Sequence, residues 1–126
     1  MAVILIVEDD ADNKDLVTRF LKREGHSVLH AEDGEAGVSA AKAHLPALVV
    51  MDLGLPGMDG WEAARQIRAS PETAHIPIVA LTASTLSESV FKAAEAGIDA
   101  YETKPVAYQR LMRKIEELVK TKRPAR

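Results

Sequence analysis

Hydrophobic residues in this chain form short continuous runs that alternate with longer stretches of helical periodicity. Three runs are almost wholly apolar: Ala2 to Val7, Ala47 to Met51 and Ile78 to Leu81. Runs of this length are typical of strands buried on both faces of a parallel sheet. Two further strand candidates, Ser27 to Ala31 and Ile98 to Thr103, mix polar with apolar residues. We therefore expect five strands, with the three apolar ones at the centre of the sheet and the mixed ones at its edges.

Segments with helical periodicity or helix-capping residues follow each of these strands. Five helices are expected, from Asp10 to Glu24, from Asp33 to Leu45, from Asp59 onward, from about Leu86 to Ala96 and from Val106 to Lys120. Strands that alternate with helices predict an α/β fold with helices on both faces of a parallel sheet. The placement of the apolar strands favours a flavodoxin-like, doubly wound, five-stranded sheet of order 2-1-3-4-5. In that order the chain changes direction between the first and third strands.

Polar residues follow the apolar runs directly. Glu8-Asp9-Asp10 comes after the first strand, Asp52 after the third, Thr82 after the fourth and Lys104-Pro105 after the fifth. Because the carboxyl ends of parallel strands lie at one edge of the sheet, these residues are expected in one crevice, where open α/β sheets bind their ligands. The first and third strands are neighbours, so Glu8, Asp9 and Asp52 should converge.

Carboxylates in such a crevice suit Mg²⁺, which prefers hard oxygen ligands. Asp52 is the best candidate nucleophile, because no helix follows it and a capping role does not explain it; a carboxylate can form an aspartyl-phosphate. Lys104 can pair with phosphate and Thr82 can donate a hydroxyl hydrogen bond. Taken singly, each residue has an ordinary structural explanation, such as a helix cap or a surface lysine. Their predicted convergence favours a cation-assisted phosphoryl site.

Composition excludes several other classes of function. The chain of 126 residues has the length of one domain and contains no cysteine, which excludes disulfides and thiolate metal sites. A formal net charge of −3 argues against nucleic acid as a partner. No apolar stretch approaches the ~18 residues of a membrane span, and because the sequence opens directly into a predicted strand we expect no signal peptide. We expect a cytoplasmic protein. The histidines (His26, His30, His44 and His75) lack ligand spacing and are expected at the surface.

Four segments together resemble one known family, the receiver domain of two-component response regulators. They are ILIVEDDADN, LVVMDLGLPGMDG, PIVALTAS and AYETKP, and the resemblance covers nearly the whole chain. It implies a receiver domain over residues 1–122, followed by a short basic tail at 123–126 and no effector domain. A stand-alone regulator is therefore expected.

The resemblance also implies roles for individual residues. Asp9 would be a direct Mg²⁺ ligand, Glu8 would help through water, and Asp52 would be both phosphoacceptor and ligand. The backbone carbonyl of Gly54 would complete the protein ligands, with Mn²⁺ as an alternative metal. Thr82 and Lys104 match the switch hydroxyl and the phosphate-pairing lysine. Further implied features are the aromatic switch Tyr101, a cis Lys104–Pro105 bond, and small residues, Gly54 and Ser84, at positions that tune dephosphorylation.

The implied function is a phosphoacceptor signalling switch. A sensor histidine kinase or a histidine phosphotransferase domain would donate the phosphoryl group to Asp52. A changed face, made of the fourth helix, fifth strand and fifth helix, would then signal to a downstream protein target. The chain would assist its own phosphorylation and autodephosphorylation without being a classical turnover enzyme. We expect a monomer; dimerisation on phosphorylation stays open.

Three alternatives were weighed against this function. A pseudo-receiver would bind partners without being phosphorylated, although the acid, threonine and lysine set is complete. An aspartyl phosphatase of the haloacid-dehalogenase type would need an acid where Gly54 stands. A flavodoxin-like flavin or nucleotide binder would need glycine and hydroxyl residues instead of Glu8-Asp9-Asp10, whose charges repel phosphate.

Overall fold

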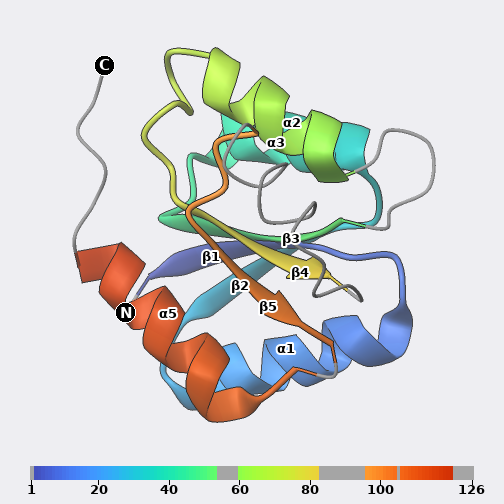
Figure 1. Cartoon of the computed structure of the whole chain (residues 1–126), viewed down its shortest axis with the longest axis vertical. Coiled ribbons are helices and arrows are strands. Elements are labelled where there is room, and N and C mark those ends of the chain that lie inside the picture. Colours follow the sequence, from blue (N-terminus) through green and yellow to red (C-terminus); the bar gives the residue numbers. More distant parts are fainter. Residues whose placement is uncertain (1, 54–59, 83–95, 105, 121–126) are drawn as a thin grey trace.

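Five parallel strands form a single sheet at the centre of the molecule (Figure 1). The computed structural model describes residues 2–53, 60–82, 96–104 and 106–120. The strands are β1 (Val3–Val7), β2 (Ser27–Ala31), β3 (Leu48–Asp52), β4 (Ile78–Thr82) and β5 (Ala100–Thr103). Their order is β2-β1-β3-β4-β5, and every neighbouring pair is parallel. The predicted flavodoxin-like sheet is confirmed.

Helices cover both faces of the sheet (Figure 1). They are α1 (Ala11–Arg23), α2 (Gly34–His44), α3 (Gly60–Ala69) and α5 (Tyr108–Lys120). Helices α2 and α3 pack on one face through a core that includes Val38, Ala64 and Ile67. Helices α1 and α5 pack on the other, where Leu21 and Leu111 are fully buried. The fourth predicted helix, Leu86 to Ala96, lies outside the described residues except for Ala96.

Burial along the strands follows their position in the sheet. Every residue of β3 and β4 is buried, and so is every residue of β1 except Val3. In β2 only Ala31 is buried, and in β5 only Glu102. Helices on both faces leave a central strand no solvent-facing side, whereas an edge strand keeps partial access. This confirms the prediction that the continuous apolar runs are central.

Side chains fix where several elements begin. The Asp10 carboxylate accepts a hydrogen bond from the Asp12 N–H at 3.1 Å and caps α1, and Asp33 caps α2 through the Ala36 N–H at 2.8 Å. Strand β5 begins two residues later than predicted. The reason is local, because the Asp99 carboxylate accepts the Ile78 N–H at 2.8 Å in place of a strand carbonyl.

Candidate functional site

The three predicted acids meet at the carboxyl end of β1 and β3. Glu8 directly follows β1, and Asp52 is the last residue of β3, the strand beside it. One oxygen from each of Glu8, Asp9 and Asp52 lies within 4.8 Å of the others. Asp9 is exposed, whereas Glu8 and Asp52 are buried. Of the three acids, Asp9 is therefore the one that faces solvent.

Lys104 reaches into the same cluster from the end of β5. Its Nζ lies 3.3 Å from Asp52 Oδ1 and 3.6 Å from Glu8 Oε1. The Lys104 backbone N–H donates to the Thr82 carbonyl at 2.8 Å, which ties the end of β5 to the end of β4. One ammonium faces three carboxyl groups, so the fully ionised cluster has an excess of negative charge.

The Glu8 carboxyl is almost completely buried. Its side chain is 1% exposed, and Oε1 has no hydrogen-bond partner among the described residues. The other oxygen, Oε2, accepts from the Asp10 N–H at 3.3 Å. Burial raises the pKa of Glu8 to about 7, helped by a hydrogen bond with Asp52 and by the charge of Asp52. The Asp10 N–H and the Lys104 charge act in the opposite direction.

The donor set of this cluster fits a hard divalent cation. Carboxylate oxygens are the ligands that Mg²⁺ prefers, and a cation would offset the repulsion that raises the pKa of Glu8. Glu8 Oε1 is buried and has no hydrogen bond among the described residues, where Lys104 Nζ lies 3.6 Å away; a cation would give this oxygen a closer partner, as buried polar atoms usually have. Residues Glu8, Asp9 and Asp52 thus have both the chemistry and the spacing of a Mg²⁺ site.

The structure describes two further predicted site residues, Thr82 on β4 and Tyr101 on β5. Thr82 ends β4 and is 7% exposed. Tyr101 is half-buried on β5 and packs against the core beneath α2 and α3. Gly54, Ser84 and Pro105 fall outside the described residues. His30 and His44 are exposed as expected, whereas His26 and His75 are half-buried.

Gly60 supports the site in a way that sequence reasoning missed. It is the first residue of α3, and a Cβ added there would lie 2.3 Å from the Asp52 carbonyl oxygen and 2.7 Å from Leu53 Cα. Both neighbours are backbone atoms, so only a residue without a side chain allows α3 to start against the end of β3. A glycine in the first turn of a predicted helix, where it is a poor helix former, was the available signal.

The fold and this site define a class of protein: a doubly wound α/β domain with an acid cluster and a lysine at its topological switch point. The sequence profile of the family described as "Response regulator receiver domain" matches residues 4–116. The chain therefore belongs to the response regulator receiver domain family. Such domains act in two-component signalling, and the acid cluster fits their phosphoacceptor site.

Individual relatives agree with this assignment. Protein PilH of Pseudomonas aeruginosa is 35% identical over 94% of this chain and 98% of its own length. A crystal structure of a putative response regulator from Chloroflexus aurantiacus superposes with a TM-score of 0.91 at 29% identity, covering 94% of this chain and 98% of that one. The receiver domain of sensor histidine kinase PA1611 from Pseudomonas aeruginosa has a TM-score of 0.88 at 32% identity, over 94% and 98% of the two chains. That structure is described with a magnesium ion coordinated in its active site cleft.

The comparisons favour none of the three alternatives to a receiver. The described part of the chain also holds no helix with the length and apolar character needed to cross a bilayer.

Proposed function

We propose that Asp52 is the phosphoacceptor of this receiver domain. A carboxylate oxygen of Asp52 attacks the phosphorus of a phosphohistidine on a sensor histidine kinase or histidine phosphotransferase domain. The phosphorus–nitrogen bond breaks, and the imidazole leaves with the electron pair. The observation that carries the proposal is the position of Asp52, whose Oδ1 lies 3.3 Å from Lys104 Nζ at the centre of the acid cluster. Lys104 is placed to stabilise the negative charge of the transferred group.

The metal would be held mainly by Asp9 and Asp52, with the Gly54 backbone carbonyl as a further ligand and Glu8 acting through water. The spacing of the three acids and the buried Oε1 atom of Glu8, which has no hydrogen bond among the described residues, support this arrangement. A bound Mg²⁺, or Mn²⁺ in its place, supplies positive charge to the oxygens of the transferring group.

Phosphorylation would then act as a two-state switch. Thr82 moves toward the phosphoryl group and Tyr101 turns inward, which changes the face formed by the predicted fourth helix, β5 and α5. A downstream protein target recognises that face. From the family resemblance we further propose that Gly54 and Ser84 tune the lifetime of the phosphoryl group and that the Lys104–Pro105 bond is cis.

The wider proposals follow from the same signalling role. The receiver domain spans residues 1–122 with a basic tail at 123–126, acts in the cytoplasm, and assists its own phosphorylation and autodephosphorylation without classical turnover. It works as a monomer that engages protein partners, with neither nucleic acid nor a membrane as a ligand.

The test is labelling with acetyl phosphate in the presence of Mg²⁺, followed by intact mass spectrometry. The chain should gain the mass of one phosphoryl group, and Asp52→Asn should abolish the gain. Asp15→Asn, which changes an exposed carboxylate on α1, is the matched control and should leave labelling intact. Labelling that survives Asp52→Asn refutes the assignment, and a wild-type chain that takes no label is a pseudo-receiver.

A further inference from the structure

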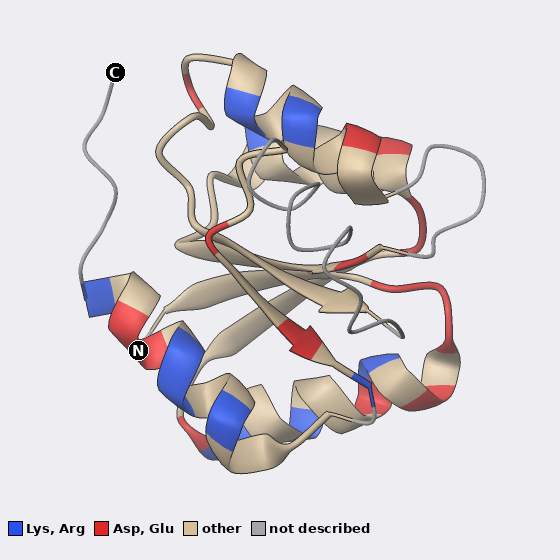
Figure 2. Ribbon diagram, in the orientation of Figure 1, with Lys and Arg blue, Asp and Glu red and all other residues tan. Residues whose placement is uncertain are grey.

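A hollow lies at the amino edge of the sheet, opposite the acid cluster. There β1, β3 and β4 begin side by side, since the Ala47 N–H donates to the Val3 carbonyl at 2.8 Å and the Val49 N–H to the Pro77 carbonyl at 2.9 Å. The hollow has a volume of about 270 Å³, and its lining includes Val3, Leu45, Pro46, His75, Ile76 and Pro77. Figure 2 shows acidic segments where β1 and β3 end, whereas the loops at this opposite edge are mostly uncharged. The phosphoacceptor chemistry makes no use of this edge.

Leu45 is an unfavourable residue for its position in the isolated chain. It ends α2 in the left-handed backbone conformation, with φ 48°, which glycine or asparagine adopts with less strain. Its side chain is also 53% exposed, and Val3, which lines the same hollow, is 41% exposed. These two are the exposed large hydrophobic residues in the part of the chain that the structure describes. Contact with another molecule would cover this apolar surface and give the leucine side chain a use.

The walls of the hollow suit one large apolar side chain. Pro46 and Pro77 have a fixed φ and Ile76 is almost fully buried, so little conformational entropy is lost when a ligand enters. The volume of about 270 Å³ lies below the roughly 300 to 1,000 Å³ of sites that enclose a drug-sized molecule. His75 is half-buried and offers a ring nitrogen to an N–H or O–H group. A tryptophan or tyrosine side chain meets these conditions, because each combines a large ring with one polar hydrogen.

Bases adjoin the hollow. The last turn of α2 leads into Leu45 and carries Lys42 and His44, which are both exposed. His75 is a third base, and none of the described lining residues is acidic. The acid on the adjoining loop, Glu72, is exposed. Because the whole chain has a net charge of −3, this edge differs in sign from the chain as a whole, and it favours acidic groups in a ligand.

We propose that this amino-edge hollow docks a tryptophan or tyrosine side chain of a protein partner, flanked by acidic residues in the partner's sequence. The contact covers Leu45 and Val3 and places the partner's carboxylates beside Lys42 and His44. The proposal goes beyond phosphoryl transfer and does not depend on it, because the first and last residues of parallel strands lie at opposite edges of the sheet. A partner bound here leaves Asp52 accessible to a phosphoryl donor.

The test uses the unphosphorylated, ¹⁵N-labelled chain and a Glu-Trp-Glu tripeptide with acetylated and amidated ends. The tripeptide should give saturable shifts of the Leu45, Ala47 and His75 amides. Glu-Ala-Glu, which lacks the ring, should give none, and Lys-Trp-Lys should bind roughly three- to tenfold more weakly because its charges are reversed. Asp52→Asn should bind Glu-Trp-Glu as the unaltered chain does, which separates this site from the phosphoacceptor site.

Leu45→Asn distinguishes docking from a structural role. Asparagine keeps the left-handed conformation and removes the apolar side chain, so binding should weaken by about five- to tenfold while the Tm stays the same or rises. A purely structural role for Leu45 predicts the reverse, a lower Tm with unchanged binding.

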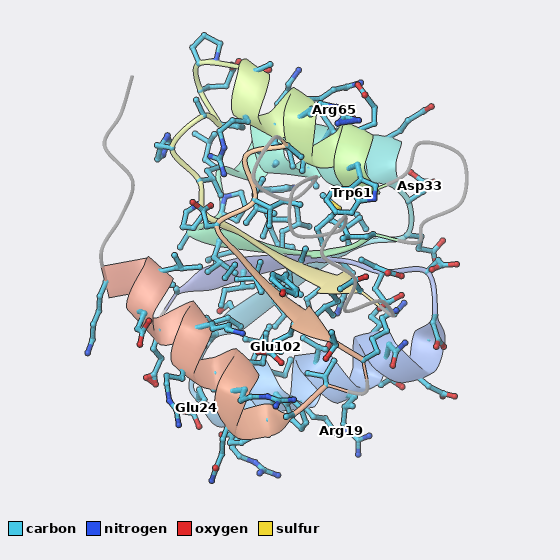
Figure 3. The ribbon with its side chains drawn as sticks, viewed as in Figure 1. Arg19, Glu24, Asp33, Trp61, Arg65 and Glu102 are labelled. Atoms are coloured by element: carbon cyan, nitrogen blue, oxygen red, sulfur yellow. The ribbon has the colours of Figure 1, made fainter. Side chains whose placement is uncertain are left out.

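Two exposed bases provide a matched pair that tests the charge. Lys42→Gln should weaken Glu-Trp-Glu binding by about two- to threefold, and it decides the question should Leu45→Asn fail to fold by circular dichroism. Arg19→Gln should leave binding unchanged, because Figure 3 places Arg19 on α1 away from the amino edge. Equal effects of Lys42→Gln and Arg19→Gln, equal binding of Glu-Ala-Glu, or loss of binding in Asp52→Asn would overturn the proposal. Shifts of the same amides with chain concentration alone would also overturn it, since the hollow would then hold a second copy.

Discussion

Glu8 directly follows a strand whose side chains are buried from Ile4 to Val7, and its own carboxyl group is buried as well. Ionisation there means placing a charge beside Asp52 with little water to screen it. Lys104 and the Asp10 N–H offset this only in part, since the pKa of Glu8 is still raised to about 7. In the native fold without metal, Glu8 therefore stays protonated at pH values well above its ordinary pKa, up to about pH 7.

This raised pKa makes a stability prediction with a definite sign. The stabilising contribution of neutral Glu8 is complete below about pH 4.5 and is lost as pH rises through about 7. In EDTA at pH 8, Glu8→Gln should raise the free energy of unfolding by about 1 to 2 kcal/mol, and at pH 4.5 the two proteins should converge. Urea denaturation at both pH values measures this. Glu72→Gln, at an exposed loop position, is the control, and a Glu8→Gln protein that is less stable at pH 8 contradicts the prediction.

Individual residues differ in how far sequence could place them. Asp52 could be singled out because no helix follows it, and Glu8 and Asp9 because their strand is adjacent to that of Asp52. Glu102 and Arg68 could not, since their partners come from other elements. An acid in an edge strand usually faces solvent, and nothing local in the sequence indicates that α5 covers Glu102.

Among the elements, α3 depends on a backbone contact with β3. Gly60→Ala would place a methyl group 2.3 Å from the Asp52 carbonyl oxygen, whereas Gly37→Ala on α2 would meet the Val7 methyl groups at 2.8 and 3.0 Å. A side chain can shift to relieve such a contact, but a strand backbone cannot. Gly60→Ala should lower the free energy of unfolding by about 2 to 3 kcal/mol and also slow labelling of Asp52. Because Val7 is buried and β-branched, its side chain can relieve the contact only in part; Gly37→Ala should still cost less than Gly60→Ala, about 1 kcal/mol, and equal losses in urea denaturation would refute the distinction.

Arg68 joins α3 to the segment that precedes β5. Its guanidinium donates to the Gly97 carbonyl at 3.1 Å, the Ile76 carbonyl at 2.9 Å and the Asp99 carboxylate at 3.0 Å. The same carboxylate accepts the first N–H of β4, from Ile78. One side chain thus aligns the start of β4 with the start of β5, which explains why β5 begins later than its hydrophobic pattern predicts.

Loss of this connection should lower the stability of the fold. Arg68→Ala leaves the Asp99 carboxylate, whose side chain is 8% exposed, without its cation and should lower the free energy of unfolding by about 3 kcal/mol. Arg65→Ala is the matched control, because Arg65 lies on the same helix and forms an exposed ion pair with Glu62 at 3.4 Å. That control should lose less than about 0.5 kcal/mol. Thermal denaturation of both variants tests the difference, and similar losses would rule out the proposed connection.

At the scale of the molecule, the hydrophobic pattern predicts the order of the strands more completely than it predicts the properties of the site. Central strands need apolar residues on both faces, so a wholly apolar run indicates a central strand. Edge strands have no such requirement, and the edge strand β5 contains Glu102 with its ion pairs. The sheet order in turn brings Glu8 and Asp52 together across more than forty residues of sequence. The raised pKa of Glu8 could not be predicted from the sequence, because it depends on burial and on the distances to Asp52 and Lys104.

That raised pKa couples metal binding to the stability of the whole molecule. Mg²⁺ bound as proposed to the native acid cluster, and not to the unfolded chain, should raise the free energy of unfolding by about 1.4 kcal/mol at roughly ten times its dissociation constant. Binding favours ionised Glu8, whose pKa is about 7, so the same Mg²⁺ concentration should stabilise the protein more at pH 8 than at pH 5.5. Thermal denaturation with Mg²⁺ or EDTA at each pH measures this difference. Asp52→Asn should reduce it and Asp15→Asn should not; a Mg²⁺ effect that is equal at both pH values, or unchanged in Asp52→Asn, would place the cation away from the acid cluster.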